Sequence, residues 1–368
     1  MKKILNIISI VLFFSLVGMF AVSTVMFGKL EHRKKGESYA SVLQRSAENS
    51  FPLFENWRSF YTALITAAGQ SRIGDIYVSD ERMIDILSRT DDDAVAANTE
   101  AINAFAERYP GRTVFSMIVP TASGIYSADL PMVITATDQQ KLIDDIYFSL
   151  DRSIVTLDAY NPLFSARDDY IYFRTDRSWT AVGAYAVYEK TVRKMGFTPL
   201  SLSNYDMEYA ARDYYGDLYY ETYYSGTKGD LVQLFRNKNG SFVTGVRAWS
   251  GDTEYEYSSI YYMPAAKAQD KLEIFLGGDM YDKYTITTSN VDAPKLLVVK
   301  GSCANMLIPF LTPHYSEITI IDADSIGREG IEKLADPRKY DHVLFLFSAD
   351  EFSTENVLRD LQPERRRP

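Results

Sequence analysis

The stretch Lys295-Leu-Leu-Val-Val-Lys300-Gly301-Ser302-Cys303-Ala304-Asn305 joins an apolar run to a turn, a serine and a helix-forming segment. It predicts a buried strand over 296–299 and a helix over 304–311. In open α/β sheets the functional groups lie at the carboxyl ends of the strands, where we expect Ser302. There a helix N-terminus stabilises an oxyanion, although a serine in this position also serves simply as a helix cap.

The same alternation extends outward from this unit. Strands are predicted at 73–78, 113–119, 154–157, 317–321 and 342–347, and helices at 93–109, 138–150 and 180–195. Thr180 is the expected N-cap of the last helix, and Gly196 follows its end. Strands that alternate with helices indicate an α/β fold, in which a mostly parallel sheet is covered on both faces.

Composition excludes several classes of protein. The 368 residues carry a formal net charge of −10, which argues against a nucleic-acid-binding protein. The single cysteine, Cys303, excludes an internal disulfide and a thiolate zinc cluster. The acidic run 91–93 is typical of the first turn of a helix rather than of a calcium site. We expect neither a metal nor a cofactor.

The N-terminus predicts a membrane anchor. Met1-Lys2-Lys3 precedes 24 uncharged residues, 4–27, which as a helix would span about 36 Å. This length suits an uncleaved transmembrane signal anchor over 1–28. A cleaved signal ending at 21–23 and a buried helix are the alternatives. The basic residues on both sides of the run give a conflicting orientation, because their count alone would place the body in the cytoplasm.

The rest of the chain divides into a juxtamembrane stalk and packing segment at 29–70 and an α/β domain at 71–368. Within that domain, residues 205–275 interrupt the alternation. Twelve of the 27 tyrosines lie between Tyr205 and Tyr262, which predicts a tyrosine-rich β insertion or lid. These tyrosines either pack a β layer or form an aromatic platform for carbohydrate.

Four segments together resemble the DHHW family of bacterial surface proteins, relatives of the SGNH-hydrolase-like alginate O-acetylation proteins. The family carries Thr-Asp-His-His-Trp-Thr where this chain has Thr175-Asp176-Arg177-Ser178-Trp179-Thr180. It carries Lys-Asp-Ser-Tyr-Ala-Asn at 300–305 and Phe-Leu-Gly-Gly-Asn at 275–279. Residues 119–122 (Val-Pro-Thr-Ala) are a further shared landmark. The resemblance covers residues 73–350 and implies a three-layer, SGNH-hydrolase-like fold.

The resemblance also implies an Asp-His-Ser triad, in which a serine attacks an acyl carbon and a histidine accepts its proton. Carried over by position, Ser302 is the nucleophile and Asp176 the orienting carboxylate, but Ser178 occupies the place of the base. Arg177 replaces the other histidine, and Gly301 and Asp279 also depart from the pattern. Arg177 and Trp179 are candidates for substrate binding, and Trp179 also fits a packing role.

No other histidine is placed to act as the base. His32 lies in the stalk, His314 lies beyond the helix that follows Ser302, and His342 begins a strand at the opposite edge of the sheet. An unshifted carboxylate is a poor match for a serine hydroxyl. The sequence therefore predicts a catalytically disabled member of the family.

Three functions remain open. The first is a non-catalytic protein that binds a cell-surface polysaccharide beside a membrane-bound O-acyltransferase, in polysaccharide O-acetylation. The second is an active O-acetyltransferase or acetylesterase that uses Ser302 with an unconventional base. The third is a scaffold of a surface-assembly complex without a ligand. In each, the resemblance implies that the body lies outside the cytoplasm, at the cell membrane.

Overall fold

A computed structural model describes residues 10–15, 17–19, 22, 39–50, 53–240, 242–278 and 280–361. The chain divides into two units: residues 1–70 with 222–225, and residues 71–221 with 226–368. Most of the apolar run predicted as a membrane anchor lies outside the described residues, as do His32 and Asp279. Within the described part of the chain, no helix has both the length and the apolar character needed to cross a bilayer.

The first unit contains two described helices, α2 (Tyr39–Ser50) and α3 (Phe54–Ala67). The Thr62 hydroxyl donates to the carbonyl of Thr222 at 2.5 Å, and Phe54 packs edge-on against Tyr223. These contacts tie the short segment 222–225 to α3. Along α3 the aromatic side chains of Trp57, Phe60 and Tyr61 remain exposed.

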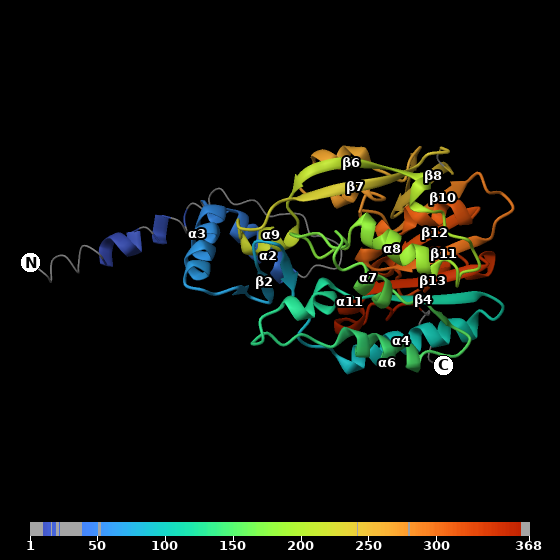
Figure 1. Cartoon of the computed structure of the whole chain (residues 1–368), viewed down its shortest axis with the longest axis horizontal. Helices are drawn as coiled ribbons and strands as arrows, with labels where there is room; N and C mark the ends of the chain where they lie inside the picture. Colours follow the sequence, from blue (N-terminus) through green and yellow to red (C-terminus); the bar gives the residue numbers. More distant parts are fainter. Residues whose placement is uncertain are drawn as a thin grey trace, which may run out of the picture. The chain divides into compact units, whose positions relative to one another are not determined.

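The second unit is built on an eight-stranded sheet (Figure 1). Its strand order is β5-β4-β13-β11-β12-β10-β8-β9, and the five strands from β5 to β12 run parallel to one another. Strands β10, β8 and β9 extend it in antiparallel pairing. The bounds of the strands are β4 Thr113–Val119, β5 Val155–Thr156, β8 Val243–Ser250, β9 Thr253–Tyr257, β10 Lys283–Thr288, β11 Lys295–Lys300, β12 Glu317–Asp322 and β13 His342–Ser348.

Both faces of the parallel strands are buried, because alternate residues of each strand point to opposite sides. In β11, Leu297 and Val299 join a core with α4 (Asp92–Arg108), α6 (Gln139–Ser149) and α11 (Ala349–Thr354). Leu296 and Val298 join a second core with α8 (Ala181–Thr191) and α10 (Ile308–Leu311). Figure 1 shows α4 and α6 on one side of the sheet and α8 on the other. The unit is therefore a mixed α/β fold with a large, mostly parallel sheet, as the sequence predicted.

Smaller elements complete the second unit. Residues 205–275, for which the sequence predicted β structure, contain β8, β9 and a separate antiparallel pair, β6 (Tyr205–Tyr214) and β7 (Asp230–Asn237). A three-stranded sheet is formed by β1 (Arg72–Ile73), β2 (Ile76–Val78) and β3 (Met83–Asp85). Three short helices are α5 (Ala122–Ile125), α7 (Tyr160–Ser165) and α9 (Asp217–Thr222). Turns of 3₁₀ helix lie at Ser127–Asp129, Leu202–Asn204, Met263–Lys267, Leu272–Ile274, Ser302–Met306, Thr312–His314, Ala323–Ser325, Ile331–Lys333 and Pro337–Lys339.

Two predicted elements are wrong in detail. The single strand expected at 73–78 is the hairpin β1–β2, because Gly74 adopts a left-handed conformation with φ of 62° and reverses the chain. The helix expected at 304–311 is instead a 3₁₀ segment from Ser302 to Met306, followed by the single turn of α10. Pro309 has no N–H and cannot take part in a continuous helical ladder. Ser302 therefore does not begin a long helix.

Helix caps follow the local sequence. The Asp91 carboxylate accepts from the N–H groups of Asp93 and Ala94, so the acidic run 91–93 caps α4 as expected. The Thr180 hydroxyl accepts from the N–H of Gly183 at the start of α8.

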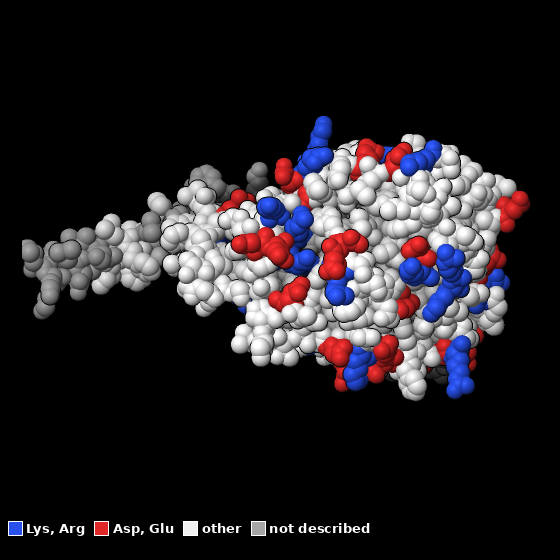
Figure 2. Space-filling view, in the orientation of Figure 1, with Lys and Arg blue, Asp and Glu red and all other residues white. Residues whose placement is uncertain are grey.

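On the face shown in Figure 2, acidic and basic side chains are interspersed rather than gathered into a broad field of one sign.

We predict that Gly183→Ala destabilises the second unit by about 1–3 kcal/mol, because an added methyl group would overlap the carbonyl oxygen of Ile171. Gly245→Ala is the matched control, since no atom lies within 4 Å of the position its Cβ would take. Urea unfolding of both variants measures the difference. Equal stability of the two variants would contradict the close packing of α8 on Ile171.

Candidate functional site

The parallel strands end around one cavity of about 280 Å³. Val119 ends β4, Ser348 ends β13 and Ser302 follows β11, and all three line the cavity. The segment 176–179 supplies another wall, and Asp85 to Leu87 a third. The cavity thus lies at the carboxyl edge of the sheet, where the topology of α/β proteins places ligands. It brings together Asp176, Arg177, Ser178, Trp179 and Ser302, five of the residues that the sequence singled out.

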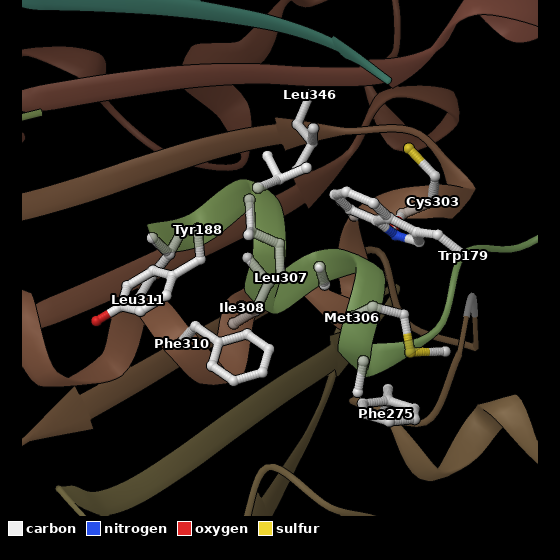
Figure 3. Close-up of a cluster of buried hydrophobic side chains, with 14 of the residues drawn as sticks. Trp179, Tyr188, Phe275, Cys303, Met306, Leu307, Ile308, Phe310, Leu311 and Leu346 are labelled. Atoms are coloured by element: carbon white, nitrogen blue, oxygen red, sulfur yellow. The ribbon is translucent and has the colours of Figure 1, made fainter. Parts of the chain in front are cut away.

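The Trp179 side chain holds the segment 175–179 against the turn that carries Ser302. Its indole N–H donates to the carbonyl of Cys303 at 2.7 Å, and the ring is 1% exposed. Figure 3 shows Trp179 beside Cys303, near the cluster that includes Leu307 and Phe310. Trp179 contacts the cavity with little exposed surface, so packing is its main role. The Cys303 thiol is buried, and this burial raises its pKa well above the usual range.

Glu351 of α11 holds Ser302. One carboxylate oxygen, Oε1, accepts from the Ser302 hydroxyl at 2.6 Å and from the Ser302 N–H at 2.9 Å. The other oxygen, Oε2, accepts from the hydroxyl and N–H of Ser348 at 3.0 and 3.3 Å, which completes a capping box on α11. Burial and the neighbouring Asp350 carboxylate raise the pKa of Glu351, against these hydrogen bonds.

Gly301 leaves the space that this arrangement needs. A Cβ at position 301 would overlap Oε2 of Glu351 and approach the ring of Phe347 to 3.0 Å. An aspartate at this position, as in the motif that the sequence resembles, would displace the Glu351 side chain from Ser302. Gly301 and Glu351 therefore belong to one local arrangement.

Asp176 and Ser178 are neighbours within the same wall. Oδ1 of Asp176 accepts from the N–H of Ser178 at 2.9 Å, and Oδ2 accepts from the Tyr214 hydroxyl at 2.7 Å. Gly216 is needed here, because a Cβ at that position would overlap the Asp176 carboxylate. Asp176 is thus held by the main-chain amides of Ser178 and Asp217 and by a tyrosine. Ser178, in the position of the family base, offers only a hydroxyl.

Arg177 is surrounded by acidic side chains. Its Nε donates to Asp85 at 2.6 Å, and its Nη atoms donate to Glu221 at 2.8 and 2.9 Å and also to Asp217. Burial and the nearby Asp176 carboxylate raise the pKa of Asp217, while the Arg177 guanidinium opposes the rise. The guanidinium therefore joins β3 to α9 rather than presenting an unpaired cation to the cavity.

The described histidines lie away from the cavity. Nε2 of His314 is 2.9 Å from the Tyr188 hydroxyl, and His314 stacks on Phe197. His342 opens β13, at the opposite end of this strand from Ser348, and Nδ1 lies 3.0 Å from the Tyr315 hydroxyl. Neither residue lines the cavity. The expectation that His342 lies at the wrong edge of the sheet is confirmed.

Sequence reasoning missed Glu351, Asp350 and Asp85. The pattern Ser348-x-x-Glu351 directly after a predicted strand is a capping-box signature and indicates a helix start there. No local pattern indicates that Glu351 reaches Ser302, 49 residues away, or that Asp85 reaches Arg177, 92 residues away. Among the described residues, no group of three or more histidine, cysteine or acidic side chains is arranged to hold a metal ion.

The tyrosine-rich region contributes to both packing and a second cavity. Tyr205, Tyr214 and Tyr261 are buried. Tyr257, Tyr262 and Tyr281 line a cavity of about 550 Å³ near the turn at 276–277, where the hydroxyls of Tyr257 and Tyr281 are hydrogen-bonded to each other. Packing thus accounts for part of the tyrosine content, and other tyrosines line this second cavity.

Comparison with known proteins gives a family match and several structural relatives. The family model described as DHHW protein matches residues 25–321. A DHHW family protein from Eubacterium siraeum has a crystal structure with a TM-score of 0.67 and 21% identity, covering 79% of this chain and 99% of that chain. Bacillus cereus PatB1 with a sulfonyl adduct gives a TM-score of 0.66 and 18% identity, covering 78% of this chain and 98% of that chain. No match was found among curated proteins.

We predict that His314 makes stability fall as the pH decreases. Burial lowers the pKa of His314 to about 4, whereas an unfolded histidine has a pKa near 6.5. Between these values the unfolded chain binds the proton more readily, so the contribution of neutral His314 is lost as the pH falls from about 6.5 to 4.

The variant His314→Phe should have a flatter stability profile over this pH interval, whatever its stability at pH 8. Urea unfolding at several pH values measures the slope. A slope unchanged by the substitution would show that His314 is not held neutral by burial.

Proposed function

The chain belongs to the DHHW family, and from this premise we propose that it binds an acylated cell-surface polysaccharide at the Ser302 cavity without the serine–histidine chemistry implied for that family. In this proposal it works outside the cytoplasm beside a membrane-bound O-acyltransferase, in polysaccharide O-acetylation. The observation that carries the proposal is the double hydrogen bond from Ser302 to one oxygen of Glu351.

A serine nucleophile needs a proton acceptor with a pKa near the working pH. At the family's base position this chain has Ser178, whose hydroxyl is no base at neutral pH. Neither His314 nor His342 reaches the cavity. In a well-studied serine protease, loss of the catalytic histidine lowers kcat by about 10⁶. A loss of this size would leave binding as the function of the site.

The hydrogen bonds of Glu351 also oppose acyl transfer because they interfere with stabilisation of the oxyanion. Acyl transfer needs hydrogen-bond donors aimed at the oxyanion that develops beside the nucleophile. The N–H of Ser302 is adjacent to that position, but it donates to the Glu351 carboxylate. A carboxylate held there repels a developing oxyanion.

The cavity itself supports binding of a small group. Its walls combine apolar side chains such as Ala122 and Leu218 with the hydroxyls of Thr121 and Ser348. A volume of about 280 Å³ lies just below the usual range for ligand sites, and suits an acyl ester together with part of one sugar ring.

A second candidate function is serine-dependent acyl transfer with Glu351 as the proton acceptor. The specific observation in its favour is the 2.6 Å contact between the Ser302 hydroxyl and Oε1 of Glu351, together with the raised pKa of Glu351. In that reaction Glu351 would take the hydroxyl proton and be neutral when the oxyanion forms, which would remove the repulsion.

We predict that the full-length protein releases no acetate from an activated acetyl ester in a Ser302-dependent manner. The native protein and Ser302→Ala should give the same rate. A sulfonyl fluoride, which transfers its sulfonyl group to activated serine hydroxyls, should leave Ser302 unmodified in intact-mass measurements. Turnover abolished by both Ser302→Ala and Glu351→Gln would instead establish the second candidate.

The geometry also limits how chemistry can be restored. Ser178→His and Gly301→Asp would reintroduce family residues, as would Asp279→Asn, at a position outside the described residues. With Glu351 in place, however, the new side chain at 301 would overlap Oε2. A restored triad therefore also requires a smaller residue at 351, such as Glu351→Ala.

We propose that the N-terminal apolar run retains the protein in the cell membrane with residues 28–368 outside. The support is the 24-residue run together with the surface role that the resemblance to the DHHW family implies. Protease added to intact spheroplasts should then degrade the body of the protein while a cytoplasmic marker survives. Full protection of the body until the cells are lysed would rule out this orientation.

A further inference from the structure

The tyrosine-rich region borders a cavity that the proposed function does not use. Its volume of about 550 Å³ exceeds the 280 Å³ of the Ser302 cavity and lies within the usual range for ligand sites. Arg236 is the one charged side chain among the described residues of its lining. We call it the tyrosine cavity, because its walls include Tyr257, Tyr261, Tyr262, Tyr281 and Tyr284.

Main-chain hydrogen bonds hold two walls of the tyrosine cavity together. The N–H of Tyr262 donates to the carbonyl of Ile274 at 2.7 Å. The N–H of Leu276 donates to the carbonyl of Ile260 at 3.0 Å. These bonds join two segments that both line the cavity. The cavity is therefore formed before a ligand binds, as ligand sites usually are.

The turn at 276–278 connects the tyrosine cavity to the segment that carries Ser302. Leu276 and Gly277 line the cavity, and the carbonyl of Gly278 accepts from Nδ2 of Asn305 at 3.5 Å. Asn305 belongs to the 3₁₀ segment that begins at Ser302. Leu276 adopts a left-handed conformation with φ of 59°, which a bulky residue rarely does. Such strained positions are concentrated at ligand-binding and active sites.

The rings of the half-buried tyrosines stand at steep angles to one another. Tyr262 and Tyr281 each meet Tyr257 edge to face, with ring centroids 6.0 and 6.2 Å apart and interplanar angles of 72° and 63°. The hydroxyls of Tyr257 and Tyr281 are also hydrogen-bonded to each other. These contacts fix the orientations of the rings without stacking them face to face, so parts of the ring faces can line the cavity.

These walls suit a neutral sugar ring. The face of a pyranose presents C–H groups, whose partial positive charge is attracted to the negative face of an aromatic ring. The sugar hydroxyls need hydrogen-bond partners, and Ser258 and Ser259 supply hydroxyls at exposed positions of the lining. An anionic ligand is disfavoured, because Arg236 already forms an ion pair with Glu208. A fatty acyl chain would leave the hydroxyls of the lining unused.

We propose that the tyrosine cavity is a second saccharide subsite, in which the rings of Tyr257, Tyr262 and Tyr281 contact a neutral sugar ring without an acyl group. The inference rests on the proposed function, since this ring belongs to the polysaccharide whose acylated ring occupies the Ser302 cavity. The second subsite has its own lining residues, so the two can be tested separately.

The test uses the full-length protein in lipid nanodiscs, which avoids detergent chains that could enter the tyrosine cavity. The probes are tetrasaccharides of glucose, of N-acetylglucosamine and of mannose, all without O-acetyl groups, and binding is measured by isothermal titration. We expect at least one of them to bind with an affinity that does not change with salt concentration, because the ligand is uncharged. Saturation-transfer NMR should show the strongest transfer to the C–H groups of a sugar ring.

Variants at the cavity distinguish the ring face from the hydroxyl. Tyr262→Ala should weaken binding about tenfold, as expected for the loss of one aromatic contact. Tyr262→Phe keeps the ring and should bind nearly as well as the native protein. Tyr209→Ala is the matched control, because this exposed tyrosine of β6 does not line the cavity. Where Tyr262→Ala folds poorly, Ser258→Trp should abolish binding, since its indole would occupy the ring faces that the sugar needs.

O-acetylated forms of the same tetrasaccharides separate this inference from the proposed function. Binding that is unaffected by Tyr262→Ala and Ser258→Trp would overturn the second subsite and leave the Ser302 cavity as the site. Binding that needs Tyr262 but gains nothing from O-acetylation would support the second subsite and count against the function proposed for the Ser302 cavity. No binding by any tetrasaccharide would overturn both. Binding of dodecanol but of no saccharide would overturn the sugar assignment in favour of an acyl chain.

Discussion

The hydrogen bond from the Trp179 indole to the carbonyl of Cys303 joins two segments that are 124 residues apart in the chain. One segment carries Asp176, Arg177 and Ser178, and the other carries Gly301 and Ser302. This contact ties the two walls of the cavity to each other, and the turn after β11 that it holds contains only a short 3₁₀ segment. The buried indole both satisfies its own N–H and packs the segment onto the core. The indole therefore helps to position Ser302 relative to Asp176, together with Glu351 and Tyr214.

Within this site, Glu351 determines the reactivity of the Ser302 hydroxyl. A serine at the end of a parallel strand has the position of a nucleophile, but its reactivity depends on the groups that contact its hydroxyl and its N–H. In this chain both donate to the same carboxylate oxygen. The absence of a side chain at Gly301 permits this contact. Gly301 differs from the aspartate of the family motif, and Glu351 can reach Ser302 only because position 301 has no side chain.

The acidic side chains around the cavity are also related to a departure from the family motif, the arginine at position 177. Arg177 stands where the family motif has a histidine, and a permanent cation in that position attracts carboxylates from β3 and α9. These partners engage all three nitrogens of the guanidinium, and no hydrogen bond from it to Asp176 or Asp350 is found. The histidine replaced here is the one beside the base position, and the arginine in its place is paired with carboxylates of the protein itself.

The sequence alone determined the parts of this protein that depend on local pattern. The apolar runs became β4, β11, β12 and β13, Thr180 and Asp91 capped their helices, and the motifs placed Asp176, Ser178 and Ser302 at one edge of the sheet. It also showed that the base histidine is missing. Only the tertiary structure decided that Glu351 binds Ser302, that Arg177 forms ion pairs with three carboxylates, and that the strand expected at 73–78 is a hairpin. Local patterns report hydrophobic periodicity and capping, whereas these contacts join residues up to 92 positions apart or depend on one backbone conformation. The packing of the whole unit selects them.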